Sequence, residues 1–134
     1  MSKTREAVIL ASGARTTTQT MAPLTLAAAD GAFREILYAE DRTVLEITVD
    51  LTAFATTASL TPSLQMFDIG KGDYVTVLTG AAITSNSTVI MKYGPMLPTV
   101  ANLSAQGVIG NLWRVVMTHG NGNSHTYSVS CRLA

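Results

Sequence analysis

Residues 112–133, LWRVVMTHGNGNSHTYSVSCRL, decide the fold class, because apolar and polar side chains alternate on both sides of a glycine-rich segment. An alternation with a period of two is typical of a β-strand that has one buried face. We therefore predict strands at 112–119 and 126–133. Asn121 and Gly122 tolerate positive φ and suit a tight turn between them. In the second predicted strand and the residue before it, the side chains expected on the buried face are those of His125, Tyr127, Val129, Cys131 and Leu133.

Other strand-like stretches follow one another at short spacing from residue 33 onward. The clearest is 43–52, where Leu45, Ile47 and Val49 alternate with polar residues. Further strands are predicted at 33–39, 64–69, 74–78 and 88–93, with a hairpin loop at 70–73. We find no stretch with a convincing helical period, apart from a possible single turn at 24–29. The pattern predicts an all-β domain, a β-sandwich or jelly roll.

The composition narrows the function classes. A chain of 134 residues is expected to form one domain, and only 13% of its residues are charged, against about 25% in typical domains. A formal net charge of +0 gives little repulsion between copies, so we expect self-association. Nine basic residues are balanced by nine acidic ones without forming a basic run, which argues against nucleic-acid binding. No apolar run approaches the ~20 residues of a membrane span, so we expect no membrane partner.

The N-terminal region differs in texture from the rest. We predict that residues 1–31 form an extended arm and that residues 32–134 form the sandwich domain. The arm has no evident partner strand nearby in the sequence, so it could pair with the sheet edge of a neighbouring subunit. The side chains expected to contact that subunit or a larger particle are Lys3, Arg5, Val8, Ile9, Leu10 and Arg15.

Motifs for chemistry are scarce, and we predict no enzymatic activity, no cofactor and no metal. Cys131 shares the inward parity of its strand, which favours a core position over a catalytic thiol. His119 and His125 flank the final turn and could face each other, but a zinc site needs three or four ligands. Trp113 has the parity of buried neighbours and is expected to anchor the core. If Trp113 and Tyr127 were instead exposed, a sugar-binding module would be favoured.

Several short segments give the sequence a general resemblance to a known group of proteins. They are Thr61-Pro62-Ser63-Leu64, Gly72-Asp73-Tyr74, Ala81-Ala82-Ile83-Thr84, Tyr93-Gly94-Pro95, Trp113-Arg114-Val115 and Thr126-Tyr127-Ser128-Val129. Residues 45–133, about two-thirds of the chain, resemble small virion structural proteins of tailed bacteriophages, notably the β-sandwich decoration or cement proteins. None of these segments defines a family, so the resemblance assigns no role to individual residues.

The resemblance implies a structural protein on the outer surface of the capsid, made in the host cytoplasm. Its partners would be the major capsid protein and other copies of itself, with a homotrimer expected around a three-fold axis. The alternatives are a tail or head-tail joining protein of the virion and, more remotely, a sugar-binding attachment module. A tail-tube protein usually needs a long hairpin, and none is evident in the sequence.

Overall fold

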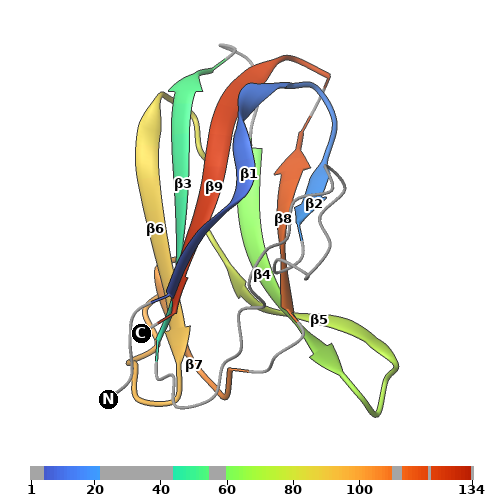
Figure 1. The fold of residues 1–134 in the computed structure, drawn as a ribbon, viewed down its shortest axis with the longest axis vertical. Helices are drawn as coiled ribbons and strands as arrows, with labels where there is room; N and C mark the ends of the chain where they lie inside the picture. The colour runs from blue at the N-terminus through green and yellow to red at the C-terminus, as the bar shows by residue number, and fades with distance from the viewer. Residues whose placement is uncertain (1–4, 22–43, 55–59, 110–112, 121, 134) are drawn as a thin grey trace.

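The structure is a computed structural model that describes residues 5–21, 44–54, 60–109, 113–120 and 122–133. All regular secondary structure in these ranges is β, arranged as two sheets that pack face to face (Figure 1). This confirms the prediction of an all-β sandwich. The strands are β1 (Arg5–Arg15), β2 (Gln19–Met21), β3 (Leu45–Ala53), β4 (Leu60–Asp68), β5 (Asp73–Thr79), β6 (Ser87–Gly94), β7 (Ser104–Gln106), β8 (Trp113–His119) and β9 (His125–Leu133).

The first sheet has the strand order β1-β9-β3-β6-β7. Its first four strands alternate in direction, because β9 is antiparallel to β1 and to β3, and β3 is antiparallel to β6. The short β7 runs parallel to β6 and pairs only with the segment from Lys92 to Gly94. Figure 1 shows β6 and β1 on opposite sides of β3 and β9.

The second sheet has the order β2-β8-β4-β5, and all of its pairs are antiparallel. Strands β4 and β5 form the hairpin expected at 70–73, where Gly72 has a positive φ of 71°. Positive φ is adopted most readily by glycine, which explains this residue at the turn. β4 begins at Leu60, four residues earlier than the predicted strand.

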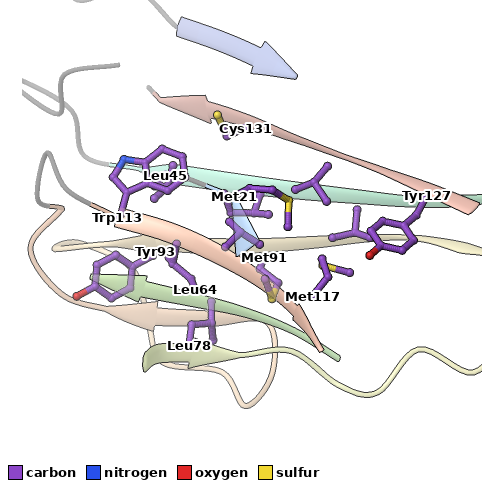
Figure 2. Close-up of a cluster of buried hydrophobic side chains, with 14 of the residues drawn as sticks. Met21, Leu45, Leu64, Leu78, Met91, Tyr93, Trp113, Met117, Tyr127 and Cys131 are labelled. Atoms are coloured by element: carbon purple, nitrogen blue, oxygen red, sulfur yellow. The ribbon is translucent and has the colours of Figure 1, made fainter. Parts of the chain in front are cut away.

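The core lies between the two sheets and consists of the inward-facing side chains of each long strand. Leu45 and Tyr127 come from the first sheet, and Trp113 and Met117 come from the second (Figure 2). These four side chains are 2% exposed or less. The inward placement predicted for Trp113 and Cys131 is therefore confirmed.

The last two strands are not a hairpin, which corrects the prediction of a tight turn at 121–122. β8 belongs to the second sheet and β9 to the first, so the segment between them crosses from one sheet to the other. Gly122 has no positive φ, and Asn121 lies outside the described residues. Alternation along the sequence reports which face is buried, but it does not report which strand is the neighbour.

The N-terminal strands belong to the sandwich. β1 pairs along its length with β9, and β2 pairs with β8. The sequence predicts that residues 1–31 form an arm outside the sandwich. Residues 5–15 and 19–21 instead form strands of its two sheets. The partner of β1 is more than a hundred residues away in the sequence, so no local pattern indicated it. The strand predicted at 33–39 and the turn predicted at 24–29 lie outside the described residues.

Candidate functional site

The predicted contact residues of the N-terminal region fall into different environments. Val8 is 56% exposed, whereas Ile9 and Leu10 are partly buried against the core. A regular arm strand would place Val8 and Leu10 on one face, but an irregularity in the register between them places Val8 opposite Ser130 and Leu10 opposite Val129. A β-bulge changes the face of all residues beyond it. Arg5 belongs to β1, and Lys3 lies outside the described residues.

The Arg15 side chain is hydrogen-bonded within its own chain. One guanidinium nitrogen, Nη1, donates to the carbonyls of Tyr127 at 2.8 Å and Gly13 at 2.9 Å. The other, Nη2, donates to the carbonyl of Ala11 at 2.5 Å, and the group lies 5.3 Å from the centre of the Tyr127 ring. Arg15 thus fastens the end of β1 to β9.

Arg15 adjoins a small aromatic cluster at one end of the sandwich, formed by Phe54, His119, His125 and Tyr127. Nε2 of His119 is hydrogen-bonded to the Tyr127 hydroxyl at 2.8 Å. The two histidine rings lie 5.3 Å apart, as the sequence suggested, and the Phe54 ring stacks on His125 at 4.6 Å. The cluster is built from β8, β9 and the residue that follows β3, and Arg15 adjoins it from the end of β1.

The cluster favours neutral side chains. Burial lowers the pKa of His119, and the nearby His125 and Arg15 lower it further. Burial also lowers the pKa of His125 and raises that of Tyr127 to about 12, although Arg15 opposes the latter shift. Within the described residues no group of three or more His, Cys, Asp or Glu side chains could hold a metal ion. Neutral, packed rings of this kind are typical of a structural cluster.

The exposed aromatic platform that a sugar-binding module would require is not formed by Trp113 and Tyr127. Both side chains are 0% exposed and lie between the two sheets (Figure 2). On the outer face of the second sheet, Arg114 lies 4.2 Å from the centre of the Tyr74 ring, and its Nε donates to the Gln65 side chain at 2.6 Å. A guanidinium that covers an aromatic ring leaves that face unavailable for stacking on a sugar.

The open edges of the first sheet are the best candidates for an interaction surface. Among the described residues, β1 is paired on one side only, and β6 is paired on its outer side only from Lys92 to Gly94. The remainder of that side of β6 is residues 87–91, of which residues 87–90 border an open groove of about 350 Å³. The groove is lined by residues of the link between β5 and β6, by β6 itself and by Leu103, and it contains no charged side chain.

Exposed apolar side chains accompany both open edges. Val8 on β1 and Ile90 on β6 are 56% and 46% exposed, and Leu103 beside the groove is 55% exposed. Sequence reasoning identified Val8 but missed Ile90. A signal existed, because Val89, Met91 and Tyr93 take the inward parity of β6 and Ile90 is an apolar residue at an outward position.

Comparisons with known proteins identify no family for this chain. The sequence matches no protein-family model, and no curated protein is significantly similar to it. In the part of the chain that the structure describes, no helix has the length and apolar character needed to cross a membrane.

Proposed function

We propose that this protein is a structural component of a tailed-bacteriophage virion, placed on the outer surface of the head as a decoration protein that bridges capsid subunits. The observation that carries the proposal is a sandwich with two open edges in one sheet, each with an exposed apolar side chain. Such edges form backbone hydrogen bonds with another chain readily. The partners would be the major capsid protein and further copies of this chain, with three copies around a three-fold axis.

Charge and composition support an assembly role. With no net charge and few charged residues, copies can approach one another at high local density. A shell presents the same contact many times, so an individually weak contact can be sufficient. Catalysis is not part of this proposal, because the aromatic cluster at the end of the sandwich is used for internal packing.

A role in the tail or at the head-tail junction is the second candidate, and one observation favours it. The sequence shows no evident long hairpin of the kind that a tail tube usually needs, yet the hairpin of β4 and β5 projects from the sandwich (Figure 1). Near its tip Ile69 is 89% exposed, and on β5 Val75 is 38% exposed. A projecting hairpin can pair with a neighbouring subunit in a ring. A sugar-binding module remains a more remote proposal without structural support at Trp113 and Tyr127.

The test separates head from tail. Heads and tails of the phage that encodes this chain are purified apart and compared by quantitative mass spectrometry. The decoration proposal predicts the protein in heads, at a fixed ratio to the major capsid protein, and predicts that purified protein rebinds heads stripped of it. Recovery in the tail fraction alone would establish the second candidate instead.

A further inference from the structure

The two open edges of the first sheet are complementary in strand direction. From β1 to β6 the strands alternate, so β1 and β6 run in opposite directions. If β1 of a second copy lay beside β6, the antiparallel alternation would continue from one copy into the next. β7 does not provide this continuation, because it is parallel to β6 and covers only the segment from Lys92 to Gly94.

The hydrogen-bonding groups at the two edges are also complementary. The amide of Lys92 donates outward to the carbonyl of Leu103. Because backbone groups alternate in direction along a strand, the N–H and C=O of Ile90 point to the same open side. Ile90, Thr48, Ser130 and Val8 are successive partners in one row across the sheet. The same alternation, followed along this row, directs the N–H and C=O of Val8 away from β9.

Val8 and Ile90 therefore have matching properties at the two ends of one row. Each has outward backbone groups, an exposed β-branched side chain on the outer face of the sheet, and no backbone partner on its open side among the described residues. Registers that keep both outer faces on one side differ by two residues. Only the register that sets Val8 directly opposite Ile90 forms a cross-strand pair from these two apolar side chains.

We propose that copies of this protein join head to tail through the first sheet, with β1 of one copy adding antiparallel to residues 87–91 of β6 in the next, and Val8 beside Ile90. The proposal names the contact within the trimer and rests on the proposed function only for the number of copies. A head-to-tail contact closes into a ring if its rotation allows and otherwise extends into a fibre. At most five residues of β6 are available, so each contact is small and assembly depends on concentration.

Disulfide cross-linking of purified protein tests the contact without any particle. Two single variants, Val8→Cys and Ile90→Cys, are mixed at high concentration and oxidised, with one carrying a mass label. A hydrogen-bonded antiparallel pair has a Cα–Cα separation of about 5.5 Å, within the range that a disulfide spans. We expect the 8–90 cross-link to form at least severalfold faster than 8–8 or 90–90. Cys131 is buried and is present in every sample, so wild type under the same oxidant gives the background.

A matched control uses the other sheet. Val75 lies on β5, the edge strand of the second sheet, and is also partly exposed. Val75→Cys mixed with Val8→Cys should cross-link no faster than background. The proposal is wrong if 8–90 forms no faster than 8–75, or if 8–8 or 90–90 dominates, since those products indicate a two-fold contact between like edges.

A second measurement uses charge at the same positions. Val8→Lys and Ile90→Lys should each shift sedimentation towards monomer while the melting temperature stays unchanged, and Val75→Lys should leave assembly unchanged. Assembly that is insensitive to both edge variants would contradict the contact. These outcomes are independent of the virion test: protein found on heads without the 8–90 cross-link refutes the contact alone, and the cross-link in a protein found only in tails refutes the decoration role alone.

Discussion

Replacing Trp113 with alanine should remove a large fraction of the stability of the sandwich. The indole is 0% exposed and lies in the core between the sheets (Figure 2). Truncation of a buried tryptophan costs about 3–5 kcal/mol, from lost apolar burial and from the cavity that remains. Domains of this size are stable by about 5–15 kcal/mol, so the variant should fold but unfold at much lower denaturant concentration.

The conservative variant Trp113→Phe separates packing from polarity. The indole Nε1 is buried and has no hydrogen-bond partner among the described residues, so its removal leaves no acceptor unsatisfied. Phenylalanine keeps most of the apolar contact, and we expect a cost of about 1–2 kcal/mol, smaller than that of alanine.

Urea titration followed by circular dichroism measures both variants, and the emission of the single tryptophan reports its environment in the wild type. A cost below about 1 kcal/mol for Trp113→Ala, or an emission spectrum typical of exposed indole, would refute the placement of this ring in the core.

Three further predictions concern pH, backbone and metal. The pKa values of His119 and His125 are lower in the folded chain than the ordinary value of 6.5, so below that pH the unfolded chain binds more protons. The free energy of unfolding should therefore be constant, for these groups, above about pH 6.5 and decrease as the pH falls below it, as urea titrations across this range can check. Gly107→Ala should lower the free energy of unfolding by about 1–3 kcal/mol, because a Cβ there overlaps the Tyr93 ring and hydroxyl. A Cβ at Gly122 meets free space, so Gly122→Ala should cost little, and calorimetry of both variants checks this difference. Zinc or a chelator should leave the melting temperature unchanged, since His119 and His125 have no third ligand among the described residues; a rise with zinc would contradict this.

Alternation allowed the central strands to be predicted from the sequence. The predicted strands at 43–52, 112–119 and 126–133 differ by at most two residues at either end from β3, β8 and β9. These strands each bury one face, so their sequences record the sandwich directly. The sequence does not show that β8 and β9 belong to different sheets. A hairpin within one sheet and a crossing between two sheets bury the same alternate residues.

Two of the longer strands were harder to predict, each for a physical reason. In β4, the predicted strand at 64–69 begins after Pro62, but the carbonyl of Pro62 faces Gly80, beyond the last residue pair of β4 with β5. The missing N–H of Pro62 therefore costs no hydrogen bond to β8. In β1, the irregularity after Val8 interrupts the period of two, and the partner strand lies at the other end of the chain.

The revised position of β1 also changes one expectation about the N-terminal region. If residues 1–31 formed only an extended arm, as the sequence predicts, a chain beginning at residue 32 would fold and lose only its attachment. Because β1 and β2 complete both sheets, we now expect this truncation to lower the stability of the sandwich as well. Point variants at Val8 are therefore the cleaner probe of attachment.

An electron-microscopy reconstruction of the phage head, at a resolution that separates strands, tests the decoration role most directly. We expect this sandwich on the outer surface, repeated around three-fold axes, with its first sheet continuing from copy to copy between β1 and β6. Density for the sandwich in the tail and none on the head would contradict it.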